Sequence, residues 1–142
     1  MPTARRALAF VLLLLAAFAS GCASAAGSRN DKLNAAQYAW SAAIRWGDFE
    51  GAWNLVDPRH RDAHPLTALE LERYKQVQIS AYRELGSQRP DKETALREIE
   101  IGVINRHTLA ERTVRYRERW RWDREAKAWW IEDGLPDLWG EP

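Results

Sequence analysis

The chain has 142 residues, and its 21 lysines and arginines nearly balance its 20 aspartates and glutamates, for a formal net charge of +1. That balance argues against a nucleic-acid partner, because proteins that bind nucleic acids carry a clear excess of positive charge. A single cysteine excludes an intrachain disulfide, and the length leaves room for one domain of ordinary size. The apolar core must therefore hold the fold, and eight tryptophans can contribute to it.

The first residues have the form of an export signal. Arg5 and Arg6 precede an apolar run from Ala7 to Ala19, and small residues then lead to Cys22. The run is 13 residues long, which is shorter than the roughly 20 residues that a helix needs to cross a bilayer. The pattern therefore predicts a secretory signal rather than a membrane-spanning helix.

The sequence Ala19-Ser20-Gly21-Cys22 resembles the lipobox of bacterial lipoprotein signals. The resemblance implies cleavage after Gly21, conversion of the Cys22 thiol to a diacylglyceryl thioether, and a membrane anchor of two or three acyl chains, which suffices for stable attachment. Ala23, in place of aspartate, implies sorting to the outer membrane of a Gram-negative cell, with the domain facing the periplasm. The alternative is an ordinary signal, cleaved near Ala19 or within residues 23–26, that releases a soluble secreted domain.

The predicted organisation has three parts. A signal peptide at residues 1–21 precedes a lipidated N-terminus with a flexible tether, rich in Ala, Ser and Gly, at residues 22–29. One α+β domain follows at residues 30–142. Removing Arg5 and Arg6 from the 21 basic residues leaves 19 against 20 acidic residues, so the processed chain has a net charge of −1.

Helical spacing of apolar residues and capping signals fill the first half of the domain. Gly47 ends the first helical pattern, Asp48 can cap the second helix, and Thr67 forms a capping box with Glu70 for the third. We expect helices over residues 31–46, 48–56 and 67–75, with a polar loop over 59–65.

In the second half of the domain, apolar residues occur at every second position. In the clearest segment, Val114, Tyr116, Trp120 and Trp122 alternate with four arginines, which is typical of a strand with one buried face. We expect strands over residues 77–85, 96–105, 114–122 and 128–133, with a loop over 86–92 and a hairpin turn over 123–127.

The segment from Ile44 to Trp53, which contains Gly-Asp-Phe-Glu-Gly-Ala, and the strand residues Trp120-Arg121-Trp122-Asp123 and Trp129-Trp130 resemble the nuclear transport factor 2-like superfamily. The resemblance implies an α+β cone, in which three N-terminal helices, preceded by the signal helix, pack in the concave face of a curved four-stranded antiparallel sheet. The superfamily includes isomerases, cyclases, dehydratases and domains that only bind, so the fold leaves the function open.

Glu118 is the anomaly of the third strand, because alternation places its carboxylate between Tyr116 and Trp120 on the apolar face. A buried carboxylate in a pocket is a candidate general acid or base. Alternation in the first strand also places Arg83 on the apolar face. An ion pair between Glu118 and Arg83, or a β-bulge that turns Glu118 outward, is therefore the structural alternative.

His60 and His64 are four residues apart and lie near two aspartates, a combination that suits a metal ion or an acid–base pair. Pro58 and Pro65 argue against a helix through this segment. Without a helix, a spacing of four residues does not place the two histidines side by side. We therefore expect a solvated loop without a metal ion.

Four arginines, at alternate positions from Arg115 to Arg121, line the polar face of the third strand. They could bind an anionic partner such as lipid headgroups or peptidoglycan. Cross-strand pairing with Glu98, Glu100 and Glu132 is the preferred interpretation.

Trp129 and Trp130 are adjacent on a strand and therefore face opposite sides of the sheet. One of them is expected to be exposed, or covered by a partner or by the tail around Trp139.

The preferred hypothesis is a non-enzymatic lipoprotein domain that binds an envelope protein or a small apolar ligand, without a cofactor. One alternative is a small enzyme of the isomerase, cyclase or dehydratase type, with Glu118, His60 or His64 as general acid or base. The other is a structural accessory of an envelope assembly. The predicted ligand-binding residues are Trp40, Trp53, Arg83, Tyr116, Glu118 and Trp120.

Overall fold

The computed structural model describes residues 28–140 of a chain that divides into two compact units, Met1–Asn34 and Ala35–Pro142. Of the first unit, residues 28–34 are described, and they are helical. The predicted signal peptide, the predicted lipidation site Cys22 and residues 22–27 of the predicted tether lie outside the described residues. Among the described helices, none is long and apolar enough to cross a membrane.

The second unit begins inside a helix that runs to residue 46 and ends at Gly47. The φ of Gly47 is +72°, a conformation that glycine adopts without strain at the end of a helix. Trp40 and Ile44, one helical turn apart, are fully buried, which confirms the apolar stripe of the prediction. The helix is already formed at residue 28, so it begins earlier than the predicted start at 31.

Two of the short helices that follow begin at the predicted capping residues. α2 (Phe49–Trp53) has Asp48 as its N-cap, and the Asp48 carboxylate accepts a hydrogen bond from a backbone N–H of the first turn at 2.8 Å. α4 (Ala68–Tyr74) begins with the capping box of Thr67 and Glu70. Both caps satisfy backbone donors that would otherwise lack a partner.

The prediction of a loop over residues 59–65 is wrong, because α3 (Pro58–Ala63) forms there. Pro58 lies in the first turn, where its missing N–H is not needed and its fixed φ suits a helix. Asp57 caps α3 by accepting a hydrogen bond from the Arg59 N–H at 2.9 Å. The helix stops before Pro65, so only the end of the segment is irregular.

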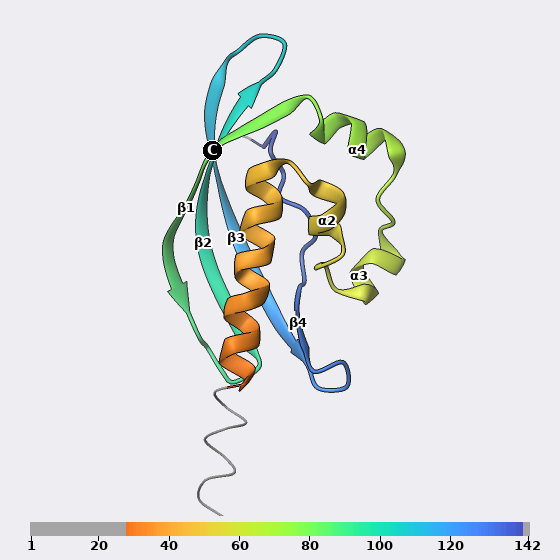
Figure 1. Ribbon diagram of the computed structural model, residues 1–142, viewed down its shortest axis with the longest axis vertical. Helices are drawn as coiled ribbons and strands as arrows, with labels where there is room; N and C mark the ends of the chain where they lie inside the picture. The colour runs from red at the N-terminus through yellow and green to blue at the C-terminus, as the bar shows by residue number, and fades with distance from the viewer. Residues whose placement is uncertain (1–27, 141–142) are drawn as a thin grey trace, which may run out of the picture. The chain divides into compact units, whose positions relative to one another are not determined.

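The strands form one antiparallel sheet in the order β1-β2-β3-β4, and the helices of the second unit lie on its concave face (Figure 1). This arrangement confirms the predicted α+β class and the four-stranded sheet. β1 extends beyond the predicted end at residue 85, into the segment predicted as a loop. The strands are β1 (Val77–Gln88), β2 (Thr94–Asn105), β3 (Glu111–Asp123) and β4 (Ala128–Ile131).

A β-bulge in β1 reverses the predicted faces of the strand's second half. The pairing with β2 shifts between Ile79 and Ala81, and beyond the shift Tyr82 is buried while Arg83 is exposed. A bulge adds one residue to a strand, so every later side chain changes face. Gly102 of β2 makes the bulge compatible with close packing, because a Cβ at this position would lie 2.4 Å from the Ser80 hydroxyl oxygen.

The C-terminal tail after β4 is fixed to the domain by buried contacts. Leu138 is fully buried, and the Arg112 guanidinium donates a hydrogen bond to its carbonyl oxygen. The Tyr74 hydroxyl donates to the carbonyl oxygen of Pro136 at 2.9 Å, and the Trp139 ring packs edge-on against the Tyr74 ring at 5.0 Å. The tail is therefore part of the core rather than a free extension.

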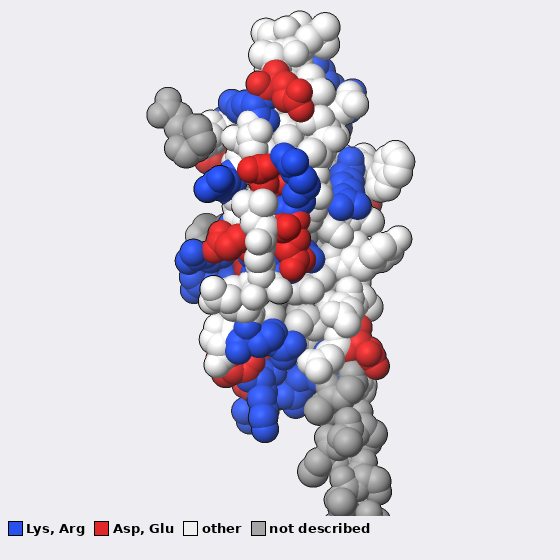
Figure 2. All heavy atoms as spheres, turned by 90° about the vertical axis from the view of Figure 1, so that its left-hand side faces the viewer, with Lys and Arg blue, Asp and Glu red and all other residues white. Residues whose placement is uncertain are grey.

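The convex face of the sheet carries closely mixed charges (Figure 2). Arg117 of β3 pairs with Glu98 of β2, and Arg119 lies 3.9 Å from Glu132 beyond β4. These contacts confirm the predicted pairing for Arg117 and Arg119, whereas Arg121 pairs with Asp57 and Asp123. Glu100 differs from the prediction, because it pairs with Arg83 at 2.5 Å.

Candidate functional site

Glu118 is fully buried on the inner face of β3, where both of its carboxylate oxygens accept hydrogen bonds. Oε1 accepts from the Tyr82 hydroxyl. Oε2 accepts from Nε of Arg97 at 2.7 Å and from Nε1 of Trp120 at 2.9 Å, and Nη2 of Arg97 also lies 2.7 Å from it as an ion pair. One cation and two neutral donors therefore surround the carboxylate.

Arg97 is the cation of this cluster, in the role that the sequence assigned to Arg83. Arg97 lies directly opposite Glu118 in the register of β2 and β3, and it is 8% exposed. Its Nη1 also lies 3.3 Å from Glu84 of β1, so the guanidinium links three strands. Alternation with Ile99 and Ile101 in the sequence was a signal that Arg97 faces inward.

Tyr82 enters the cluster because of the bulge in β1. Burial in the core, the negative charge of Glu118 and the hydrogen bond to it raise the pKa of Tyr82 well above its ordinary value. The phenol therefore stays protonated and donates to Glu118 throughout the pH range of a folded protein.

The geometry makes Glu118 a structural charge. A general acid or base must reach a substrate within hydrogen-bond distance. Glu118 has no exposed surface, and its two oxygens already accept three hydrogen bonds, one of them from the guanidinium with which it forms an ion pair. Displacing one of these donors would leave a buried charge without its partner, which is energetically costly.

The remaining predicted ligand-binding residues do not form a single pocket around Glu118. Trp40 and Trp120 are fully buried and pack edge to face, with their ring centroids 6.2 Å apart. The Tyr116 hydroxyl donates to the carbonyl oxygen of Gly134 at 3.4 Å. Arg83 lies on the outer face, so its predicted place beside Glu118 is wrong.

His60 and His64 lie side by side at the end of α3. Their rings stack with centroids 4.7 Å apart, and the Trp53 ring meets His60 edge-on at 6.0 Å. Within residues 28–140, no group of three or more His, Cys, Asp or Glu side chains is placed to hold a metal ion. The two histidines form an aromatic contact between α2 and α3.

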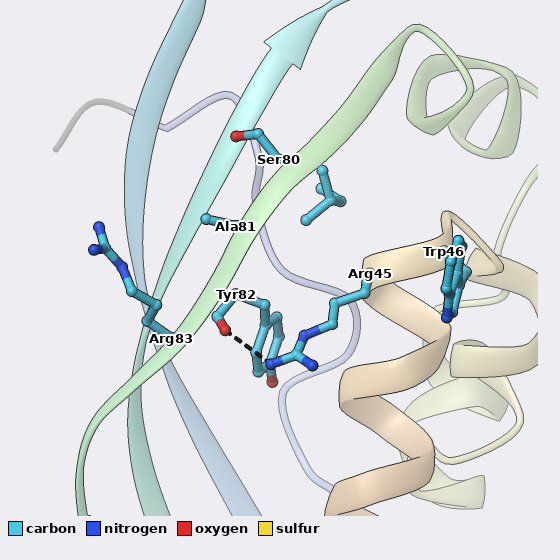
Figure 3. Close-up of a pocket in the computed structure, with 7 residues that line it drawn as sticks. Arg45, Trp46, Ser80, Ala81, Tyr82 and Arg83 are labelled. Carbon is cyan, nitrogen blue, oxygen red and sulfur yellow. Dashed lines mark hydrogen bonds between the residues drawn. The ribbon is translucent and has the colours of Figure 1, made fainter.

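A groove with a volume of about 560 Å³ lies between β1 and the end of the N-terminal helix (Figure 3). Its floor is the β1 segment from Ile79 to Arg83, and Arg45 and Trp46 of the helix line the other side. Arg45 reaches across the groove, where its Nη2 donates to the carbonyl oxygen of Tyr82 at 3.0 Å. Its guanidinium carbon lies 5.5 Å from the centroid of the Tyr82 ring.

Arg45 is the chemically distinctive residue of the groove. Its side chain is exposed, and among residues 28–140 it forms no ion pair with a carboxylate. Sequence reasoning missed both Arg45 and the groove, because Arg45 belongs to an ordinary helical pattern and the groove depends on how the helix and β1 lie together.

Asp57 is the second buried carboxylate among the described residues and is 4% exposed. Its Oδ2 lies 2.7 Å from Nη2 of Arg121 and 3.3 Å from Nη2 of Arg59. Burial alone would raise the pKa of Asp57, but the hydrogen bonds from Arg59 and Arg121 outweigh it and lower the pKa below 3.8. The carboxylate thus joins the N-terminus of α3 to β3.

We expect the free energy of unfolding to fall as the pH drops from about 4 towards the lower pKa of folded Asp57. In this range the unfolded chain binds a proton at Asp57 before the folded chain does, so protonation favours unfolding. Urea unfolding at about pH 6 and about pH 3 measures the loss. Asp57→Asn should lose less stability between these two pH values, and an equal loss in both proteins would contradict the assignment.

Comparison with known proteins identifies likenesses of fold only. No known family matches the chain, and no curated protein sequence matches it. A SEC-C motif-containing protein from Psychrobacter arcticus superposes with a TM-score of 0.52 at 10% identity, over 68% of this chain and 56% of that chain. A ketosteroid isomerase-like protein from Erwinia carotovora atroseptica has a TM-score of 0.49 at 18% identity, over 71% of this chain and 88% of that one.

The chain therefore spans little more than half of the Psychrobacter protein, and at 10% identity the likeness shows a shared fold without a shared activity. The α+β plan that the superfamily resemblance implied is present in the structure itself.

Proposed function

We propose that this domain is a non-enzymatic binding module of a lipoprotein, anchored through Cys22 to the outer membrane and facing the periplasm. The observation that carries the proposal is the contrast between the two polar sites. Glu118 is sealed and fully hydrogen-bonded, whereas the groove beside β1 is open and presents Arg45 without a carboxylate partner in the described part of the chain.

The groove suits an extended segment of a partner protein that carries a carboxylate. β1 is an edge strand of the sheet, so one side of its backbone is not paired with another strand. An extended peptide can add to such an edge through main-chain hydrogen bonds. Register shifts at Ile79/Ala81 and Glu84/Gly86 limit regular pairing to the short stretch from Ala81 to Glu84. Arg45, which now holds the Tyr82 carbonyl, would then pair with the partner's carboxylate.

A test of the groove is capture of the partner in intact envelopes by a photo-crosslinking residue at Ser80. We expect Arg45→Gln to reduce capture several-fold, because the variant keeps a hydrogen-bond donor but loses the charge. Arg115→Gln, on the outer face of β3, is the matched control and should leave capture unchanged. Equal capture by the Arg45→Gln protein and the unchanged protein would refute the proposed role of the groove.

The anchor is tested separately at Cys22. We expect Cys22→Ala to abolish metabolic labelling with a palmitate analogue and to leave the protein soluble or as an uncleaved precursor. Gel fluorescence and membrane fractionation report the two effects. Label that persisted on the Cys22→Ala variant would show that lipidation does not occur at this position.

A further inference from the structure

The outward side of the N-terminal helix exposes two large aromatic side chains. Tyr38 is 77% exposed and Trp46 is 88% exposed. They are eight residues apart with Ala42 between them, so all three lie on one side of the helix. Trp46 lies at the end of the helix, where it also lines the groove beside β1 (Figure 3). An exposed apolar surface of this kind on a small domain commonly marks an interaction site.

The exposed side of the helix also has few of the charged residues that are usual there. A surface helix normally carries charged residues on the side that faces solvent. Between residues 35 and 46 the only charged residue is Arg45, and no acidic residue occurs. Ala35 and Ala39 are also exposed, so small apolar side chains fill the spaces beside the two aromatic rings. We call Ala35, Tyr38, Ala39, Ala42 and Trp46 the aromatic helix face.

The chemistry of this face matches the boundary between lipid headgroups and acyl chains. Tyrosine and tryptophan concentrate at that boundary, because an apolar ring there carries a polar N–H or O–H. Residues 35–46 contain no acidic side chain that would repel anionic headgroups. A protein surface as partner would more commonly be matched by charges of both signs around an apolar centre.

The position of the face along the chain supplies the second argument. Tyr38 follows Cys22 by 16 residues and Trp46 follows it by 24. Even a fully extended chain covers only about 3.5 Å per residue. An acylated Cys22 would therefore keep Tyr38 within roughly 56 Å and Trp46 within roughly 84 Å of the membrane. A weak second contact is enough under these conditions, because the tether makes it intramolecular.

We propose that the aromatic helix face lies in the headgroup layer of the membrane to which Cys22 is anchored. The inference rests on the lipid anchor of the proposed function. It assigns the helix a second contact with the same phospholipid surface, which would orient the domain rather than leave it free on its tether.

The experiment uses the lipidated full-length protein, reconstituted in vesicles of an equal mixture of phosphatidylethanolamine and phosphatidylglycerol. Cys22 is the only cysteine, and acylation consumes its thiol, so an introduced cysteine is the only labelling site. A fluorophore is attached to Tyr38→Cys, to Trp46→Cys or to the control Leu109→Cys, which is 76% exposed in the turn between β2 and β3. All three side chains are exposed, so the substitutions leave the core intact.

We expect lipids that carry a quencher at the top of the acyl chain to quench the labels at positions 38 and 46 several-fold more than the label at 109. A soluble quencher should show the reverse order. Equal lipid quenching at all three positions would overturn the proposal. Protection from the soluble quencher without lipid quenching would also overturn it, because a protein would then cover the face.

The same experiment also tests whether Cys22 is acylated. The protein without an introduced cysteine should take up no fluorophore, because the sulfur of Cys22 has been converted to a thioether. Uptake of label by this protein would refute the anchor itself. A blocked Cys22 with unquenched labels at positions 38 and 46 would refute only the contact of the helix with the membrane.

Discussion

Replacing Arg97 with methionine is expected to lower the free energy of unfolding by about 3–5 kcal/mol, the usual cost of removing one partner of a buried ion pair. The substitution keeps most of the side-chain volume but leaves Glu118 without its cation. Glu118 is fully buried, so water cannot replace the guanidinium. Urea unfolding monitored by tryptophan fluorescence measures the loss, since the chain has eight tryptophans.

The double variant Arg97→Met with Glu118→Met is the matched control for this prediction. Removing both charges leaves an apolar pair of similar volume, and such replacements are often neutral or stabilising. We therefore expect the double variant to recover most of the lost stability. Additive losses from the two single substitutions would contradict the ion pair, because residues in direct contact should show strong coupling.

Leu138→Ala is expected to cost about 2–5 kcal/mol, as for other leucines removed from a well-packed core. Leu138 lies only four residues before Pro142 and has no exposed surface. The carbonyl oxygen of Leu138 accepts a hydrogen bond from Arg112 and that of Pro136 accepts one from Tyr74, so the cavity cannot easily close by movement of the tail.

Leu69→Ala is the control, because Leu69 is 82% exposed on α4 and alanine is equally favourable in a helix. It should change the midpoint of urea unfolding very little. Equal effects of the two substitutions would mean that the tail contributes nothing to the core of the folded protein in solution.

The parts of the fold that could be predicted are those encoded by local patterns. Alternation along β3 placed Val114, Glu118 and Trp120 on the buried face, and the capping box at Thr67 marked the start of α4. In both cases the signal lies within a few residues, and no distant segment changes its meaning.

The predictions were wrong where a single residue changes the structure of the residues that follow it. The bulge at Ser80 exchanged Arg83 for Tyr82 on the inner face, and the only advance sign was Gly102 within the partner strand. Pro58 argues against a helix when it is read as an interior residue, but it lies in the first turn of α3, where proline is favourable. The exposure of Trp46 could not be predicted, because its position in a helical pattern does not reveal what covers it.

The pairing of Arg97 with Glu118 also determines which sheet the chain can form. The two residues are direct partners in the register of β2 and β3. A slip of one residue would turn one of these side chains to the opposite face, and a slip of two would place Glu118 opposite Ala95 or Ile99. Each alternative register would bury a charged side chain without its partner, at a cost comparable to much of the stability of a small domain. The ion pair therefore favours a single register of β2 and β3. Apolar residues at positions 97 and 118 would not discriminate between registers in this way.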